Sequence, residues 1–306
     1  MDNYNRRFGR KLNVLICILL LSIIGLIYYY FIVNQSFNGY KHVIIIGVDG
    51  AGMAFEKVSS PNIDRIFSNY ALRHDTKTEN ITYSAQNWGS ILTGVACETH
   101  KYTNDSISEK THYSTGILSV FGYVRKAIPD ANLVSIVDWK PINNGIVEND
   151  IGVNLINHNS DLEVLNASVD YLSKNDIPTL MFIYFGSADI SAHKNGGFSN
   201  DYYNTLETID EYIGKIYDVL DSKKQLKDTL FMVVADHGET VTSHGGNSKE
   251  ETSAILAVAG NSVNKTNFDA ETHNRDAAPI VLYALGIDIP DNFVAKVPNG
   301  LFKESK

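Results

Sequence analysis

Three apolar runs of the sequence are each followed by side chains that bind metals or transfer protons. The runs are "HVIIIGV", "PTLMFIYF" and "TLFMVVA", and the residues after them are Asp49, Asp189, His193, Asp236, His237 and His244. Three carboxylates brought together would repel one another, and divalent cations remove that repulsion. Carboxylates mixed with imidazoles are typical ligands of zinc and other first-row ions, whereas calcium and magnesium favour oxygen alone.

Each of these residues also has a structural interpretation when it is taken alone. Asp49 in "VDGAG" suits a turn or a helix cap, and Asp189 with His193 suits a pair on a helix surface. The stretch 236–238 suits a turn, and His244 suits an exposed loop. The glycines of "ADHGETVTSHGG" allow a tight return of the backbone between His237 and His244, which are seven residues apart.

A possible nucleophile lies in "ITYSAQNWGSILTG", where Ser84 precedes a predicted helix. A serine in this position is commonly a helix cap. The N-terminus of a helix also stabilises an alkoxide or a phosphate, and a bound metal activates a hydroxyl without a histidine base. The sequence has no Gly-x-Ser-x-Gly motif, which argues against an ordinary serine hydrolase.

The elements that must position these residues alternate between strands and helices. Strands are predicted at 42–48, 132–137, 178–185, 229–235 and 254–260, and helices at 60–71, 116–128, 161–175, 203–222 and 274–286. Leu162, Leu165, Val169 and Leu172 are expected on one face of the helix 161–175. Apolar strands interleaved with helices predict an α/β fold with a mostly parallel central sheet covered on both faces. Ligands of such sheets gather beyond the carboxyl ends of the strands.

The N-terminal part predicts a membrane anchor. Residues 12–33 form an uncharged apolar run that, as a helix, would be roughly 33 Å long, about the thickness of a bilayer core. Basic residues precede it, so residues 1–11 are expected in the cytoplasm and the domain outside. A cleaved signal peptide and a buried core helix are the alternatives. The predicted organisation is a tail (1–11), a single transmembrane helix (12–33), a linker (34–41) and one catalytic domain (42–306).

Composition restricts the partners. The net charge of −9 argues against nucleic acid, since no basic run follows the first dozen residues. The two cysteines are Cys17, inside the apolar run, and Cys97, so no disulfide is expected within the domain. The domain must therefore be stabilised by its own core. The sequence leaves the oligomeric state open.

The motifs "VDGAG", "TYSAQNWGSILTG", "DISAH", "ADHG" and "SHGG", in this order, resemble those of the alkaline phosphatase superfamily. The similarity is greatest to the nucleotide pyrophosphatase/type I phosphodiesterase group and its compact bacterial relatives, and it covers about residues 42–303. The resemblance implies a three-layer αβα sandwich and a phosphoryl-transfer enzyme with two metal ions. Zinc is the expected metal, and manganese is the alternative.

The resemblance also implies roles for individual residues. Asp189, His193 and His244 would hold one ion, and Asp49, Asp236 and His237 would hold the other. Ser84 would be the nucleophile and a ligand, and Asn87 would bind a phosphoryl oxygen. The nucleophile is Ser where many relatives have Thr. The short spacing between His237 and His244 resembles that of the compact relatives.

The expected substrate is a small phosphate ester. No arginine lies beside the motifs to neutralise a monoester, which favours phosphodiesters or nucleotide pyrophosphates, hydrolysed through a phosphorylated Ser84. Trp88, Trp139 and Tyr83 are candidates for an apolar wall, with core packing as the alternative. The other hypotheses are a phosphomonoesterase, a phospho-headgroup transferase and a non-catalytic, metal-stabilised binding protein. A sulfatase is disfavoured because the Cys/Ser-x-Pro-x-Arg motif is absent.

Overall fold

The computed structural model describes Ser22 and residues 39–303, apart from 109–115, 267 and 270. The chain divides into two compact units, of which the larger is Gly39–Lys303. Among the residues so described, no helix is long and apolar enough to span a membrane. The predicted membrane helix, residues 12–33, lies outside the described residues except for Ser22.

The larger unit is built on a seven-stranded sheet with the order β2-β7-β6-β1-β5-β3-β4. Its strands are β1 (His42–Val48), β2 (Ala71–Lys77), β3 (Leu133–Val137), β4 (Asn154–Asn157), β5 (Leu180–Phe185), β6 (Thr229–Val234) and β7 (Ser253–Ala259). The strands β1, β3, β4, β5 and β6 pair in parallel. β7 pairs antiparallel with both β6 and β2. The sheet is therefore mixed, with a parallel centre as predicted.

The two edge strands were not predicted, because their sequences lack an apolar run. β2 reads "ALRHDTK" and is mostly half-buried, and β4 has only four residues with exposed ends. Charged side chains and short length are typical of edge strands, where they discourage pairing with another chain. The predicted helix 60–71 is correspondingly shorter: α2 ends at Phe67, and Ala71 already belongs to β2.

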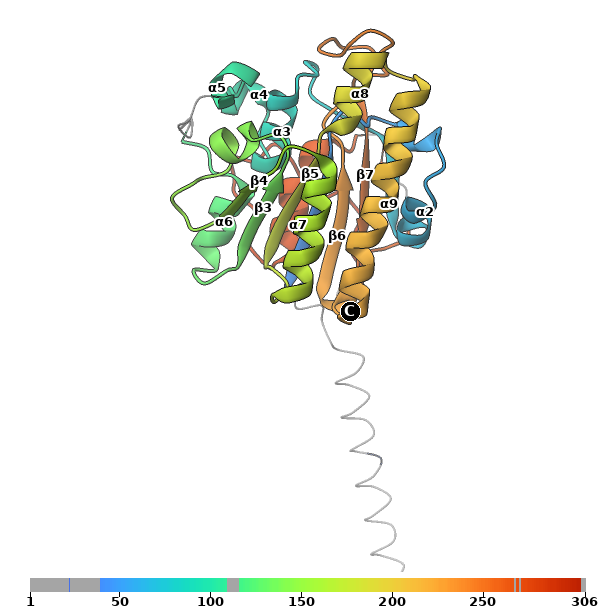
Figure 1. Cartoon of the computed structure of the whole chain (residues 1–306). Coiled ribbons are helices and arrows are strands. Elements are labelled where there is room, and N and C mark those ends of the chain that lie inside the picture. The colour runs from blue at the N-terminus through green and yellow to red at the C-terminus, as the bar shows by residue number, and fades with distance from the viewer. Residues whose placement is uncertain (1–21, 23–38, 109–115, 267, 270, 304–306) are drawn as a thin grey trace, which may run out of the picture. The chain divides into compact units, whose positions relative to one another are not determined.

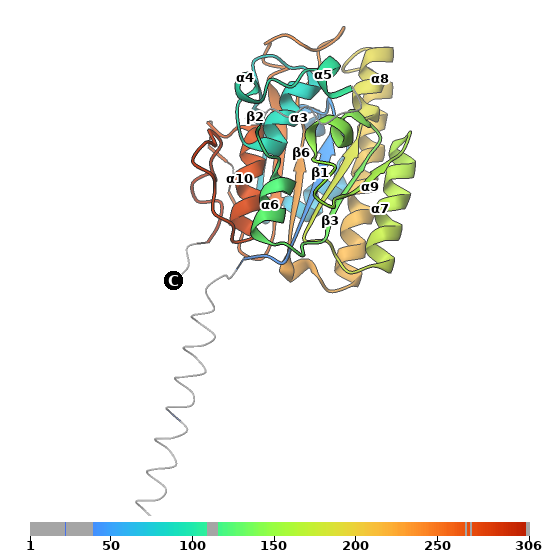
Figure 2. The same ribbon diagram turned by 90° about the vertical axis from the view of Figure 1, so that its left-hand side faces the viewer.

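Helices cover both faces of the sheet, which confirms the predicted covering on both sides. α3 (Ser84–Thr93), α6 (Val120–Ala127) and α10 (Ala277–Ala284) lie on one side, and α7 (Asp161–Lys174) and α9 (Asn200–Ser222) lie on the other (Figure 2). The remaining helices are α2 (Pro61–Phe67), α4 (Cys97–His100), α5 (Asn104–Ser108) and α8 (Ser187–Asn195), with short turns at Ala54–Glu56, Ile142–Ile146, Leu226–Asp228 and Asn274–Asp276.

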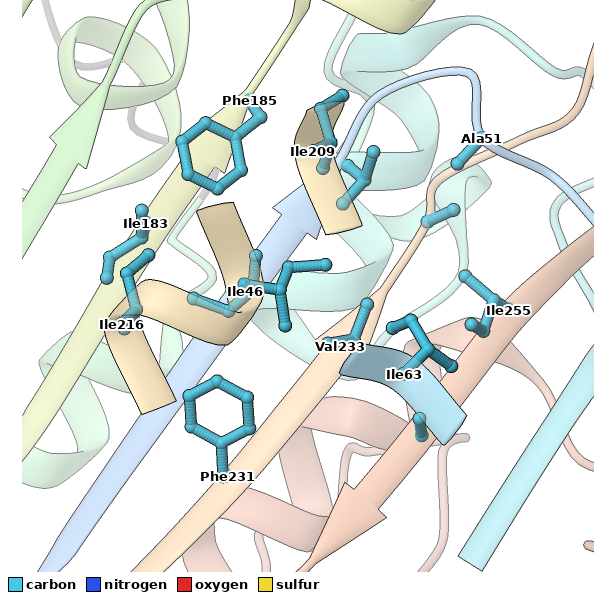
Figure 3. Close-up of a cluster of buried hydrophobic side chains, with 14 of the residues drawn as sticks. Ile46, Ala51, Ile63, Ile183, Phe185, Ile209, Ile216, Phe231, Val233 and Ile255 are labelled. Carbon is cyan, nitrogen blue, oxygen red and sulfur yellow. The ribbon is translucent and has the colours of Figure 1, made fainter. Parts of the chain in front are cut away.

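The main core lies between the sheet and the layer of α2, α7 and α9. Ile46, Ile183 and Phe231 from the strands pack against Ile209 and Ile216 of α9 (Figure 3). Burial of such side chains is the main stabilising term of an α/β unit, since each removes a large apolar surface from water. Of the residues expected on one face of this helix, Leu165 and Leu172 are buried, whereas Leu162, in the first turn of α7, is exposed.

The parallel strands end at one edge of the sheet, where α3, α4 and α8 also lie (Figure 1). Val48 at the end of β1 is in register with Phe185 at the end of β5, and Gly47 is in register with Val234 of β6. This alignment brings the segments that follow β1, β5 and β6 together. The residues just beyond these three strands therefore form one site.

Candidate active site

Asp49 follows β1 directly and is almost completely buried, with 2% of its surface exposed. One carboxylate oxygen, Oδ2, accepts hydrogen bonds from Trp88 Nε1 at 2.9 Å and from the Tyr184 hydroxyl. The other oxygen, Oδ1, has no hydrogen-bond partner in the described part of the chain. A buried carboxylate oxygen without a partner is unfavourable, so a cation is the expected partner.

Asp236 and His237 lie beside this free oxygen, just after β6. The Gly50 N–H donates to Asp236 Oδ1 at 3.1 Å, while Oδ2 has no hydrogen-bond partner among the described residues. His237 Nε2 is 3.2 Å from that Oδ2, 3.5 Å from Asp49 Oδ1 and 3.3 Å from Ser84 Oγ. Tetrahedral ligands at about 2.1 Å from an ion lie about 3.4 Å apart. The four side chains therefore fit a single divalent cation.

Asp189, His193 and His244 form a second group of the same kind. Asp189 Oδ1 is 3.2 Å from His244 Nε2 and 3.4 Å from His193 Nε2, and the two imidazole nitrogens are 3.0 Å apart. The Thr82 carbonyl accepts from His244 Nδ1 at 2.6 Å, which directs Nε2 toward Asp189. The donors are again spaced as ligands of one ion. The structure thus brings together all six of the predicted aspartates and histidines, in the two predicted groups.

Ser84 is the first residue of α3, and its hydroxyl faces His237. The N-cap residue is Tyr83, whose side chain makes no capping hydrogen bond, so Ser84 does not cap the helix. The Ala85 N–H, in the first turn, donates to Asn104 Oδ1 at 3.0 Å. Asn104 is exposed and lies 20 residues after Ser84, so no local sequence signal points to it. It places an amide group beside the candidate nucleophile.

The side chain of Asn87 is fully buried and forms hydrogen bonds with the segment that precedes Ser84. Its Oδ1 accepts from the Glu79 N–H at 2.9 Å, and its Nδ2 donates to the carbonyls of Ile81 and Tyr83 at 3.0 and 3.2 Å. These bonds hold the turn that presents Ser84. A phosphoryl oxygen at Asn87 would have to compete with two backbone carbonyls.

Burial and the charges of neighbouring side chains shift the pKa values of the aspartates and histidines in the site. Burial and then the charge of Asp189 raise the pKa of Asp49 to about 7, and burial with Asp49 raises the pKa of Asp236 well above its usual value. Burial and the neighbouring His244 lower the pKa of His237 to about 3. Burial opposes ionisation of Asp189 as well, but the neighbouring His244 imidazole lowers its pKa overall. A neutral His237 is ready to act as a metal ligand.

The structure adds a residue that sequence reasoning missed. Glu239 follows His237 by two positions, is 2% exposed, and lies with Asp189, His237 and His244 in a cluster whose ligand atoms are all within 4.8 Å of one another. Burial and then the charge of Asp189 raise its pKa to about 10. Its position inside "ADHGE" was the available signal, but an acidic residue between loop glycines is more commonly exposed.

Of the three aromatic residues considered for a wall of the site, only Tyr83 is exposed and lies against a candidate metal ligand. Trp88 is fully buried and packs edge-on against Tyr184, so it belongs to the core. Trp139 stacks on the same Tyr184 ring. Tyr83 is 45% exposed and lies edge-on to the His244 ring. Tyr83 is therefore the aromatic side chain of the three that can contact a ligand.

Several solved structures have a similar fold. Murine ectonucleotide pyrophosphatase/phosphodiesterase 5 aligns with a TM-score of 0.67 at 13% sequence identity, covering 82% of this chain and 97% of that protein. A putative sulfatase from Bacteroides thetaiotaomicron aligns with a TM-score of 0.67 at 13% identity, covering 84% of this chain and 73% of that protein. The chain has the α/β fold of the alkaline phosphatase superfamily.

Curated relatives are similar in sequence over part of the chain. GPI ethanolamine phosphate transferase 1 of Saccharomyces cerevisiae is 26% identical over 161 residues, which are 46% of this chain and 17% of that protein. The Yarrowia lipolytica protein of the same name is 24% identical over 213 residues, which are 61% of this chain and 23% of that protein. The chain thus spans about a fifth of the length of these relatives.

The family match covers more than half of the chain. Residues 133–302 match the family described as type I phosphodiesterase/nucleotide pyrophosphatase. This region carries the strands β3 to β7 and five of the six clustered aspartates and histidines, all except Asp49. The chain belongs to the type I phosphodiesterase/nucleotide pyrophosphatase family.

Proposed function

We propose that this protein is a phosphodiesterase that hydrolyses phosphodiesters or nucleotide pyrophosphates through a phosphorylated Ser84. The observation that carries the proposal is the position of the Ser84 hydroxyl, 3.3 Å from His237 Nε2 and at the first residue of α3. A phosphoryl group attacked by Ser84 would lie against the N-terminus of this helix, whose N–H groups favour negative charge. Attack of the Ser84 hydroxyl on phosphorus would expel one ester alcohol of a diester, or one phosphate of a pyrophosphate. Water would then cleave the bond between Ser84 and phosphorus and release the phosphomonoester.

The donor set supports a requirement for two divalent cations, zinc or manganese. Asp49, Asp236, His237 and Ser84 would hold one, and Asp189, His193 and His244 would hold the other. Such cations supply Lewis acidity and neutralise the charge of the reacting groups. Three buried carboxylate oxygens, one each on Asp49, Asp189 and Asp236, have no hydrogen-bond partner among the described residues. Imidazole nitrogens complete both donor sets.

The charges around Ser84 favour diesters over monoesters. Lys194 and Lys249, the lysines nearest to the motifs in sequence, are exposed, and Arg275 is held by Glu79 at 2.8 Å. A phosphate monoester brings one more negative charge than a diester, and none of these cations is directed at Ser84. We therefore expect bis-p-nitrophenyl phosphate to be cleaved faster than p-nitrophenyl phosphate, and p-nitrophenyl sulfate to be inert.

Asn104 is the better candidate for binding a phosphoryl oxygen. Its amide lies at the first turn of α3, where it accepts from Ala85, whereas the Asn87 amide is engaged with backbone groups. In this arrangement Asn87 positions the turn before Ser84, and Asn104 contacts the substrate. In this proposal Asn104 binds the phosphoryl oxygen, whereas the family resemblance implies that Asn87 does.

The experiment compares the three esters on the purified full-length chain, before and after removal of metal by a chelator and after reloading with zinc or manganese. The proposal requires turnover of the diester that the chelator abolishes and the metal restores. Absence of turnover with every ester and either metal would instead favour the non-catalytic alternative. Faster turnover of the monoester would favour a phosphomonoesterase.

A phospho-headgroup transferase is the second candidate, and exposed apolar side chains close in sequence to the site residues favour it. Ile81, Tyr83, Ile190 and Val241 are large apolar side chains that are exposed. Each lies a few positions from Ser84, Asp189 or His244 in sequence, and exposed apolar surface is typical of regions that contact other molecules. Transfer of the phosphoryl group from Ser84 to an added alcohol, in excess over hydrolysis, would select this function.

The proposal keeps residues 12–33 as a membrane anchor, with the domain outside the cytoplasm. The support is the uncharged run itself and the basic residues before it. An epitope tag at the C-terminus of the full-length chain should be accessible to protease in intact cells, and a tag at the N-terminus should be protected. The reverse pattern would overturn this topology.

A further inference from the structure

We propose that Glu239 is a metal ligand, and that its carboxylate binds the same divalent cation as Asp189 and His244. The inference rests on the two-metal site proposed above and adds to it a carboxylate that none of the predicted donor sets contains. It concerns metal binding, so it is tested without any substrate.

Glu239 differs from the other buried glutamates of the described chain in having no hydrogen-bond partner, and its one ionic contact among the described residues is with His237 Nδ1 at 3.8 Å. Glu148 is paired through both oxygens with Ser119, at 2.7 and 2.5 Å. Glu251 accepts backbone N–H groups, and Glu79 pairs with Arg275. Neither oxygen of Glu239 has a hydrogen-bond partner among the described residues, although the side chain is 1% exposed. Burying an unpaired carboxylate is strongly unfavourable, so a partner must neutralise it.

The surrounding donors identify that partner as a cation. Ligand atoms of Asp189, His237, Glu239 and His244 all lie within 4.8 Å of one another. Ligands at about 2.1 Å from an ion cannot lie more than about 4.2 Å apart, so small side-chain movements would bring the donors of Asp189, Glu239 and His244 into one coordination shell. His237 Nδ1 lies 3.1 Å from the Gly238 carbonyl, which engages that nitrogen and leaves Nε2 for the other ion.

Two glycines from other segments make room for this carboxylate. A Cβ on Gly50, in the turn after β1, would lie 2.8 Å from Glu239 Oε1, and the φ of +66° at this position also favours glycine. A Cβ on Gly197, beyond α8, would lie 2.8 Å from Glu239 Cβ. Backbone therefore approaches Glu239 from both sides. The carboxylate is held in a fixed position facing Asp189.

A second carboxylate changes the chemistry of this ion. With Asp189 and Glu239 as ligands, the site offers two carboxylates beside the imidazoles of His193 and His244. Carboxylate ligands suit Mn²⁺, whereas imidazole-rich tetrahedral sites suit Zn²⁺. We infer that Glu239 increases the affinity for Mn²⁺ relative to Zn²⁺ at this position.

The test uses the purified full-length chain, stripped of metal and titrated separately with Mn²⁺ and Zn²⁺ by calorimetry, with bound metal counted by mass spectrometry. Glu239→Gln keeps the shape of the side chain and removes the charge. We expect the wild-type chain to bind two ions, and the variant to bind one of them at least about tenfold more weakly, with the larger loss for Mn²⁺. The visible absorption spectrum of bound Co²⁺ should also change, because the coordination shell changes.

Thermal unfolding separates a ligand from a structural residue. The metal-free variant should unfold at the same temperature as the metal-free wild type or higher, because a buried carboxyl without a hydrogen-bond partner is replaced by an amide that cannot ionise. Its stabilisation by added metal should be smaller. Glu148→Gln is the matched control: this buried glutamate is hydrogen-bonded to Ser119, so its loss should lower the unfolding temperature with unchanged metal affinity.

Unchanged affinity for both ions in Glu239→Gln, with an unchanged Co²⁺ spectrum, would overturn the inference. If that variant does not fold, Glu239→Asp keeps the charge but withdraws the carboxylate by one methylene group, and its affinity for one ion must also fall. If the wild-type chain binds two ions but cleaves no ester, the proposed function fails and the inference about Glu239 stands.

Discussion

The imidazole rings of His237 and His244 lie face to face, with 3.8 Å between their centroids and 16° between their planes. His237 Nε2 faces Asp49, Asp236 and Ser84, whereas His244 Nε2 faces Asp189 and His193. Gly245 directly follows His244, and its φ of +111° and close contact with the Tyr83 ring disfavour a larger residue there. One short segment thus supplies a candidate ligand to each donor group.

Removing the hydrogen bonds that orient Asp49 should weaken the cation site beside Ser84. Trp88 Nε1 donates to Asp49 Oδ2 and leaves Oδ1 facing His237, so Trp88→Phe keeps the aromatic packing but loses that bond. Loss of such an orienting bond typically lowers metal affinity by about 10- to 100-fold. Calorimetric titration with Zn²⁺ should show this loss for one of two ions. Equal affinity in the variant and the wild type would mean that packing alone orients Asp49.

Two asparagines near Ser84 should respond differently to replacement by alanine. Asn87→Ala leaves the Glu79 N–H and the carbonyls of Ile81 and Tyr83 without their side-chain partner, so we expect a loss of about 1–3 kcal/mol in unfolding free energy. Asn104→Ala removes an exposed side chain, so the free energy of unfolding should change little. If its amide binds the phosphoryl group, kcat should fall by about 100- to 1,000-fold.

The comparison is made by denaturant unfolding and by diester turnover on the same preparations. A fall in kcat for Asn87→Ala without loss of stability, together with full activity in Asn104→Ala, would return the phosphoryl contact to Asn87.

The metal-free protein should lose stability as the pH rises from 7 to 8.5. Burial raises the pKa of Asp138 to about 9, with Asp161 adding to the shift, and raises that of Glu239 to about 10. In the unfolded chain these carboxyls lose their protons at about pH 4 and are fully ionised at pH 7. Between pH 7 and 8.5 the folded state therefore binds more protons than the unfolded state. The free energy of unfolding therefore falls as the pH rises.

This trend is measured by thermal unfolding of the chelator-treated chain at several pH values. In Glu239→Gln the fall should be less steep, because one of the groups no longer titrates. A metal-free wild type that becomes more stable between pH 7 and 8.5 would contradict the assigned shifts.

The strand ends of the site could be predicted because local sequence carries both the strands and their terminal residues. Asp49 and Asp236 directly follow apolar runs, and parallel pairing of β1 with its neighbours brings such residues to one edge. The edge strands β2 and β4 could not be predicted, because polar edge strands have no distinctive periodicity.

The remaining site residues depend on contacts between distant segments. Glu239 is buried because Gly50 and Gly197 approach it, and neither glycine is its neighbour in sequence. Asn104 reaches Ala85 across 19 positions, and Leu162 is exposed although its spacing matches the buried face of its helix. Such features follow from tertiary packing, which periodicity does not encode.

The central claim is that Ser84 forms the covalent bond to phosphorus, and the most direct measurement is the mass of the protein during turnover. The full-length chain, loaded with metal and mixed with bis-p-nitrophenyl phosphate, is quenched in acid and digested for mass spectrometry. We predict a p-nitrophenylphosphoryl adduct on the peptide containing Ser84, because one nitrophenol leaves when Ser84 attacks. We also predict its absence in Ser84→Ala, and a fall in turnover of at least about a thousandfold in that variant. Ser90→Ala, in the same helix but hydrogen-bonded to His100, should keep the adduct and the activity. Turnover by Ser84→Ala at the wild-type rate, or an adduct on another residue, would contradict the account.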